Sequence, residues 1–143
     1  MTKEKAAATQ SLAKLSSLKA NVSREFDGDW VEHPDLPGFF VCVRSFNYPP
    51  YKVARDLWQR QMQKKYRDEI SEARDAEADV GAGRLYAKYL LLSWKGSDEE
   101  YTAERAMEYL TDTDWRPFRE FVEVAAMKVG QKKAEFVEVA AKN

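Results

Sequence analysis

The longest run of regularly spaced apolar positions lies within residues 50–70. Apolar side chains recur there every four residues, while most basic side chains fall elsewhere around a helix. The apolar positions are Ala54, Trp58, Met62, Tyr66 and Ile70. Pro49 and Pro50 stand just before them, and proline is tolerated in the first turn of a helix because the N–H there has no helical partner. The pattern therefore predicts a long amphipathic helix that begins at the two prolines.

The segment that follows changes from small and acidic to strongly apolar. Residues 71–83 contain Gly81 and Gly83, which loosen a helix, so this stretch is predicted to be a connector. Residues 85–94 are apolar on almost every side, which is typical of a central, buried helix. Gly96 then occupies a typical helix-stop position.

Two shorter helices are predicted in the last third of the chain. Thr102 can cap a helix whose apolar positions fall within 106–110. Asp114 can cap a final helix that has Pro117 in its first turn and an apolar stripe over 118–129. A loop rich in acidic residues separates the first of these helices from the apolar segment before it.

Upstream of the prolines, aromatic and β-branched residues replace the helical pattern. Trp30 and residues 39–46 have this composition, and two prolines and a glycine lie between them over 33–38. These features predict a small β-hairpin over about 29–46. Both faces of its second strand are largely apolar, so we expect helices to cover it.

The two ends of the chain have weaker patterns. Leucines recur every three residues in part of residues 1–22, which predicts a flexible or partly helical arm. The sequence FVEVAA occurs at 121–126 and again at 136–141. The offset is about four helical turns, so one continuous helix would place both copies on nearly the same face unless Gly130 interrupts it. A partner-docking stripe and a chance repeat of common helix composition are both consistent with this repeat.

Together these elements predict a mainly α protein, with one helical domain of four to five helices and a small N-terminal β-hairpin. The expected organisation is an arm over 1–22, a core over 23–130 and a C-terminal helical extension over 131–143.

Composition and charge narrow the class of protein. Of the 143 residues, 44% are hydrophobic and 33% are charged, which favours a folded globular chain over disorder. The formal net charge of -1 provides no long-range positive field, so nucleic acid is disfavoured as a partner. Basic residues do cluster over 55–67, but interspersed acids favour a solvated helix face there. No apolar run reaches the length of a membrane span or a signal peptide, so we expect a cytoplasmic protein.

Candidate catalytic and metal-binding residues are sparse. Cys42 is the only cysteine and lies in an apolar strand, where a structural thiol is expected. His33 is the only histidine and lies in the predicted turn, so a nucleophile–base pair and a four-ligand zinc site are both disfavoured. The chain has no phosphate-binding loop motif. We therefore expect no enzyme activity, no metal site and no cofactor.

Protein binding is the remaining class, and two surfaces are candidates for it. The predicted long helix offers aromatic and adaptable side chains of the kind enriched at interfaces, although a stripe at helical spacing is more often part of a core. The second FVEVAA copy lies near the chain end, where burial is harder. The candidate partner-binding residues are Trp58, Met62, Tyr66, Phe136, Val137 and Val139.

Several phrases in the chain resemble the tail assembly chaperones of long-tailed bacteriophages and related prophages. They are residues 27–31, the strand-like 40–47, the tryptophan–glycine segment 92–96 and the tyrosine-led 101–106. The resemblance implies a protein that coats the tape-measure protein, keeps it soluble and helps recruit major tail protein while the tube assembles. It also implies that the protein is absent from the mature virion.

Two other functions stay open beside this one. A structural virion protein, such as a connector or decoration subunit, would share the binding character but remain in the particle. A small nucleic-acid-binding regulator would use the basic cluster over 55–67. Self-association is compatible with all three.

Overall fold

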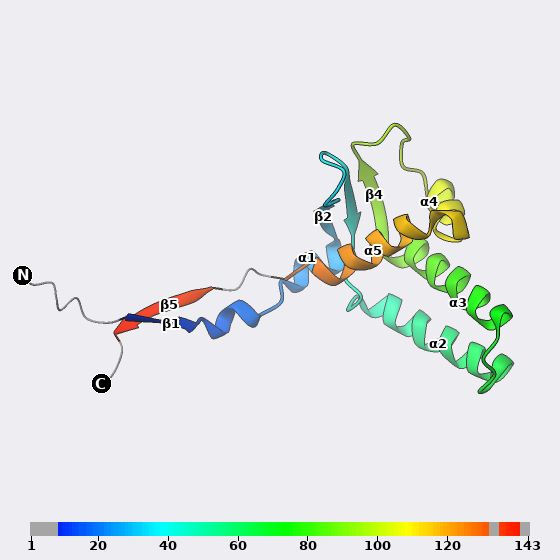
Figure 1. Cartoon of the computed structure of the whole chain (residues 1–143), viewed down its shortest axis with the longest axis horizontal. Coiled ribbons are helices and arrows are strands. Elements are labelled where there is room, and N and C mark those ends of the chain that lie inside the picture. The colour runs from blue at the N-terminus through cyan, green and yellow to red at the C-terminus, as the bar shows by residue number, and fades with distance from the viewer. Residues whose placement is uncertain (1–8, 132–134, 141–143) are drawn as a thin grey trace, which may run out of the picture. The chain divides into compact units, whose positions relative to one another are not determined.

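The computed structural model describes residues 9–131 and 135–140. The chain divides into two compact units, one formed by residues 22–130 and the other by the two ends of the chain, up to residue 21 and from residue 131 (Figure 1). Each unit is described by itself below.

The larger unit is built on a three-stranded antiparallel sheet in the order β2–β3–β4 (Figure 1). The predicted hairpin is present as β2 (Asp29–Glu32) and β3 (Phe40–Val43). The third strand is β4 (Leu91–Lys95), which pairs with the other edge of β3 so that Trp94 lies opposite Val41. The central strand therefore has a partner on both sides.

The prediction of a mainly α fold with only a small hairpin is wrong, because the protein is an α+β mixture with five strands in two antiparallel sheets. The error centres on residues 85–94, which were expected to form a buried helix. A single π-helical turn, η2 (Tyr86–Leu90), is followed directly by β4. An apolar run of this length suits a buried strand as well as a buried helix. Pairing with β3 satisfies the backbone groups along one edge of β4, and Leu91 and Trp94 are buried.

The described part of the larger unit also contains five helices. They are α1 (Val22–Asp27), α2 (Pro49–Tyr66), α3 (Glu72–Leu85), α4 (Ala103–Leu110) and α5 (Arg116–Lys128). The predicted helix at the two prolines is α2, which ends four residues before Ile70. Thr102 caps α4 as predicted, and its side chain accepts a hydrogen bond from the Arg105 amide. The prediction for Asp114 is wrong, because Asp112 caps the short 3-10 turn η3 (Thr113–Trp115) that leads into α5.

The expected connector at 71–83 is also wrong, because most of it forms α3. Ser71 caps this helix by accepting a hydrogen bond from the Arg74 amide. Gly81 and Gly83 lie inside the helix because they let other elements approach it closely. A Cβ on Gly83 would lie 1.7 Å from the Leu110 carbonyl oxygen of α4, and one on Gly81 would lie 2.4 Å from the Trp58 ring of α2. Tertiary packing thus outweighs the low helix propensity of glycine here.

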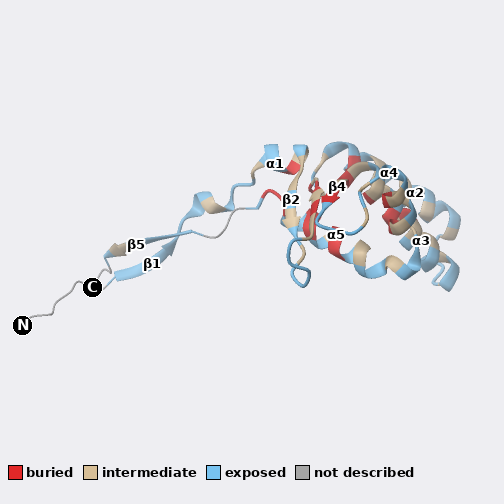
Figure 2. Ribbon diagram, turned by 90° about the horizontal axis from the view of Figure 1, so that it is seen from above, coloured by how far each residue is buried: buried red, intermediate tan, exposed pale blue. Residues whose placement is uncertain are grey.

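The core of the larger unit lies between the sheet and the inward faces of the helices (Figure 2). The fully buried side chains with the largest volumes are Leu90, Leu110, Val41, Val43 and Val122. One buried acid, Glu25 of α1, accepts hydrogen bonds from the Ser45 hydroxyl and the Asn47 amide, which satisfies the carboxylate inside the protein. These bonds hold α1 to the segment after β3.

The smaller unit contains β1 (Thr9–Ala13), the 3-10 turn η1 (Leu15–Leu18) and β5 (Phe136–Ala140). The two strands pair antiparallel, with Leu12 opposite Val137, and most of their side chains are exposed (Figure 2). The arm was expected to be flexible or partly helical, and its described part contains the unexpected strand β1 as well as the short helical turn η1. The rest of the arm, residues 1–8, lies outside the described residues.

The predicted helical extension is wrong for the described residues, because the second FVEVAA copy is a strand while the first lies in α5. Helix α5 ends just before Val129, whose backbone is extended. Gly130 follows with a φ of 83°, and a glycine with positive φ is typical of the residues that end a helix. Pairing with β1 then fixes residues 136–140 in an extended form. Residues 132–134 and the final Ala141 of the repeat lie outside the described part of the chain.

Candidate protein-binding site

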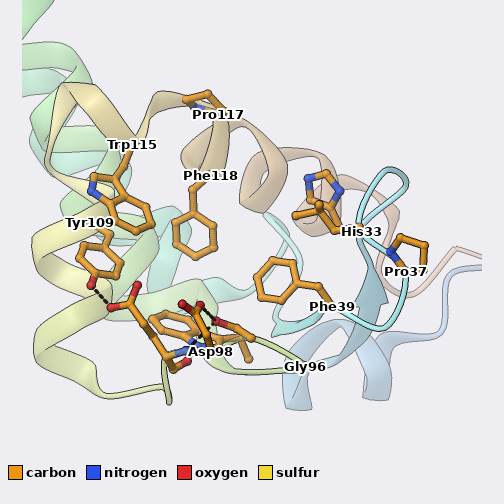
Figure 3. Close-up of a pocket in the computed structure, with 13 residues that line it drawn as sticks. His33, Pro37, Phe39, Gly96, Asp98, Tyr109, Trp115, Pro117 and Phe118 are labelled. Carbon is orange, nitrogen blue, oxygen red and sulfur yellow. Dashed lines mark hydrogen bonds between the residues drawn. The ribbon is translucent and has the colours of Figure 1, made fainter.

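A cavity of about 570 Å³ opens on the larger unit and is lined mainly by aromatic side chains (Figure 3). Its walls come from the turn between β2 and β3, the loop after β4, the end of α4 and the start of α5. The apolar lining residues are Leu36, Phe39, Trp94, Tyr109, Trp115 and Phe118. A volume of this size is within the usual range of ligand and anchor pockets.

The aromatic rings hold one another in fixed orientations. Tyr109 and Trp115 stack with centroids 3.6 Å apart and planes 5° from parallel. Phe118 meets the Trp94 ring edge-on at 5.7 Å and 88°. Trp94 is itself anchored, because its indole N–H donates to the Glu99 carbonyl oxygen at 2.6 Å. The cavity wall is therefore a preorganised aromatic surface.

Two loops meet beside the cavity, and glycine allows them to do so. Gly96, just after β4, has a φ of 83°, and a Cβ there would lie 1.8 Å from the Gly38 carbonyl oxygen. The Gly38 amide in turn donates to the Glu32 carboxylate at 3.0 Å. These contacts set the position of the 33–39 turn, which carries Phe39 into the cavity wall (Figure 3).

Two of the polar groups that line the cavity are acidic. Asp98 and Glu99 belong to the lining, which contains no lysine or arginine. Glu99 accepts a hydrogen bond from the Tyr109 hydroxyl, and this bond is the main reason that the pKa of Tyr109 is raised above its ordinary value of 10.0. Neither acid forms an ion pair within the described part of the chain. The cavity mouth thus combines aromatic faces with uncompensated negative charge.

His33 lies at one end of this cavity (Figure 3). Its ring is 4.5 Å from that of Phe121 in α5, and its Nδ1 accepts a hydrogen bond from the Asp35 amide at 3.0 Å. The turn location was expected, but the contact with α5 was not visible in the sequence. The contact gives His33 a packing role between the turn and the helix.

Three of the predicted binding residues lie instead between α2 and α3. Trp58 and Met62 line a smaller cavity of about 220 Å³. Tyr66 hydrogen-bonds to Glu77 of α3, and this bond is the main cause of its raised pKa. All three side chains are half-buried. They pack one helix on the other, and their role in partner binding stays a prediction.

The other three predicted residues lie on β5 in the smaller unit. Phe136 and Val137 are exposed, while Val139 is half-buried opposite Gln10. They remain accessible candidates, and no contact in the described residues assigns them a partner. The two predicted groups therefore belong to separate units.

Cys42 lies half-buried on β3, between Trp30 of β2 and Ser93 of β4. Burial raises the pKa of its thiol, so the group is held in its neutral form at physiological pH. Within the described residues, no cluster of three or more His, Cys, Asp or Glu side chains has an arrangement that could hold a metal ion.

With this geometry in place, comparison with known proteins gives one match, to the YdaY prophage protein family over residues 46–143. The chain belongs to the YdaY prophage protein family. No curated protein and no solved structure matches it. YdaY membership confirms the phage or prophage origin that the resemblance predicted, and the family description names no role in tail assembly.

The YdaY region contains the side of the cavity built from Trp94, Tyr109, Trp115 and Phe118, while Phe39 precedes that region. None of these residues was predicted from the sequence to bind a partner. A local signal existed, because aromatic residues recur through 94–118 at turns and helix ends rather than at one helical period.

Among the described helices, none has the length and apolar character needed to cross a membrane.

Proposed function

We propose that this YdaY-family prophage protein is a non-catalytic chaperone of phage tail assembly, which binds the tape-measure protein and helps recruit major tail protein. The observation that supports this proposal most is the open aromatic cavity beside α4 and α5. The resemblance to tail assembly chaperones supplies the identity of the partners. The same proposal places the protein in the cytoplasm of the host and outside the finished virion.

The cavity suits the recognition of amphipathic helices. Such helices are usually bound by apolar grooves that accept side chains at i, i+3, i+4 and i+7. Aromatic pockets of this kind bury large apolar anchors and supply most of the affinity at protein interfaces. A tape-measure protein is long and prone to form coiled coils, so it presents many such anchors in succession.

A second apolar surface on α2 is also available for binding. Val53 and Leu57 lie one helical turn apart on α2, with 71% and 58% of their surface exposed. Exposed apolar side chains at this spacing form a stripe that a second helix can cover. This stripe extends the contact area that a long partner would need.

Co-expression with the tape-measure and major tail proteins of the same prophage tests the proposal. We expect the tape-measure protein to stay soluble and to co-purify with the full chain. A Trp115→Ala variant should lose most of this effect, while Trp30→Phe, on β2 and outside the cavity lining, should keep it. An insoluble tape-measure protein with neither partner co-purifying would contradict the proposal, as would finding the chain as a stoichiometric component of purified particles.

A further inference from the structure

The polar groups at the mouth of the aromatic cavity favour one kind of partner. Resting on the proposed function of the cavity, we infer that its occupant is an amphipathic helical segment of a foreign protein in which a bulky apolar residue is flanked by lysine or arginine. The apolar side chain enters between the aromatic rings, and the flanking cation lies against Asp98 and Glu99. Two observations support this occupant: the charges that line the cavity, and the contacts that the nearby lysine and arginine side chains make elsewhere.

Asp98 and Glu99 lack a cationic partner within the chain. No lysine or arginine nitrogen lies within 4.0 Å of either carboxylate among the described residues. Glu99 is bonded to the Tyr109 hydroxyl and Asp98 to the Ser97 hydroxyl, both of which are neutral donors. Two adjacent acids without an ion pair, beside an apolar surface, therefore favour a partner that carries positive charge.

The nearby basic residues are held elsewhere. Lys95 lies over the rings of Trp30 and Phe40, at 4.2 Å and 5.1 Å from their centroids. Successive residues of a strand point to opposite faces, so Lys95 and the cavity residue Trp94 are on opposite sides of the sheet. Arg105 of α4 donates to the Glu100 carbonyl oxygen at 2.7 Å. Among the described residues, neither side chain forms an ion pair with Asp98 or Glu99.

The stacked rings add a second attraction for a cation. The face of an indole or phenol attracts ammonium and guanidinium groups. Tyr109, which stacks on Trp115 in the cavity wall (Figure 3), is hydrogen-bonded to Glu99, so one bound cation can contact both a ring and a carboxylate. An acidic or neutral helix has neither attraction and meets repulsion from the two acids.

Three synthetic helical peptides of about 20 residues, long enough to form helix in water, provide the probe. They share a Phe and a Leu four residues apart on an alanine background and differ only in whether the flanking positions carry Lys, Gln or Glu. Binding to the full-length protein is measured by calorimetry and by the NMR shifts of the indole N–H groups of Trp94 and Trp115. We expect the Lys peptide to bind roughly tenfold more tightly than the Gln peptide at low salt, and the difference to shrink at about 0.5 M salt.

Variants assign this preference to the two acids. In the double variant Asp98→Asn/Glu99→Gln, the Lys peptide should bind at most about twofold more tightly than the Gln peptide. Asp98→Asn alone should give part of that reduction while leaving the Glu99–Tyr109 bond intact. The matched control Asp68→Asn/Asp75→Asn removes the same charge near the α2–α3 connection and should keep the preference.

The outcomes separate this inference from the proposed function. Equal binding of all three peptides, with shifts at Trp94 and Trp115, would overturn the basic-partner inference and leave the cavity as a binding site. If no peptide binds, and the tape-measure protein still co-purifies fully with the Trp115→Ala variant, the cavity is not the binding site and its proposed role is overturned. The protein alone could also self-associate in a concentration-dependent way that weakens in Asp98→Asn/Glu99→Gln. This result would identify a second copy of the chain as the occupant and would contradict a foreign partner.

Discussion

Tyr109 of α4 lies flat against Trp115 at the entrance to α5, with ring centroids 3.6 Å apart. This stack joins the end of one helix to the start of the next across the 3-10 turn that Asp112 caps. It also forms one wall of the aromatic cavity. The same contact therefore serves packing and presents a flat apolar face to a partner.

Replacing Trp115 should affect binding more than folding. Its side chain is half-buried, and an aromatic pair contributes about 0.5–1.5 kcal/mol beyond the area it buries. We expect Trp115→Ala to lower the free energy of unfolding by about 1–2 kcal/mol in urea titrations and to abolish partner binding. Trp115→Phe retains a stacking ring and should restore much of the binding. Full binding by the alanine variant would show that the ring is not an anchor point.

The Tyr109–Glu99 hydrogen bond predicts an alkaline pH dependence. The pKa of Tyr109 is raised above 10.0, chiefly by this bond, so the folded protein favours the protonated phenol. The resulting stabilisation is fully present below the pKa of the unfolded chain and is lost as pH rises through the higher folded-state pKa. In Glu99→Gln the Tyr109 pKa should fall toward 10.0, as followed by NMR of the labelled tyrosine ring. An unchanged pKa in this variant would contradict the assignment.

Replacing Gly83 by alanine should change the stability of the protein in the opposite direction from the change that helix propensity alone predicts. Replacing glycine by alanine inside a helix normally stabilises it by about 1 kcal/mol. At Gly83 the added Cβ would lie 1.7 Å from the Leu110 carbonyl oxygen, so α3 and α4 would have to move apart. We expect Gly83→Ala to destabilise the protein by about 2–3 kcal/mol, measured by thermal or urea unfolding. The exposed control Ala76→Gly should cost about 1 kcal/mol, as propensity alone requires. A stabilised Gly83→Ala would refute the close contact.

The two FVEVAA copies provide a matched pair of phenylalanines. Phe121 in α5 has 7% of its surface exposed, whereas Phe136 in β5 has 63% exposed. All four tryptophans lie in the larger unit, so their fluorescence reports its unfolding. Phe121→Ala should lower the unfolding free energy by about 3 kcal/mol or more, and Phe136→Ala should change it by under about 0.5 kcal/mol. Equal losses would mean that Phe136 supports the larger unit.

The same repeat shows where sequence reasoning succeeds and where it stops. Identical letters form helix in one place and strand in another, so local pattern cannot decide the structure of residues 136–140. The deciding contact is with β1, more than a hundred residues away in the chain. By contrast, α2 and the cap of α4 depend on neighbouring residues, such as the two prolines and Thr102, and these were predicted.

The candidate site also depends on contacts between distant residues, which the local sequence pattern does not reveal. The stripe over residues 54–70 was predicted because its period is local, yet Trp58 and Met62 in it line the small cavity between α2 and α3. The aromatic cavity was missed because its walls come from four separate segments that only the tertiary fold brings together. Gly81, Gly83 and Gly96 were interpreted as helix-breaking or helix-ending residues, although their function is to allow close contacts. Such contacts leave no signal in the order of residues alone.

Site-specific photo-crosslinking tests the central claim most directly, which is that the aromatic cavity holds the tape-measure protein. Benzoylphenylalanine is placed at Leu36 on the cavity, at Leu57 on the α2 stripe and at Met127 on α5, positions that are 53%, 58% and 55% exposed. During co-expression, we predict a strong crosslink to the tape-measure protein from Leu36 and none from Met127. Crosslinks from Leu57 or Met127 without one from Leu36 would contradict the account.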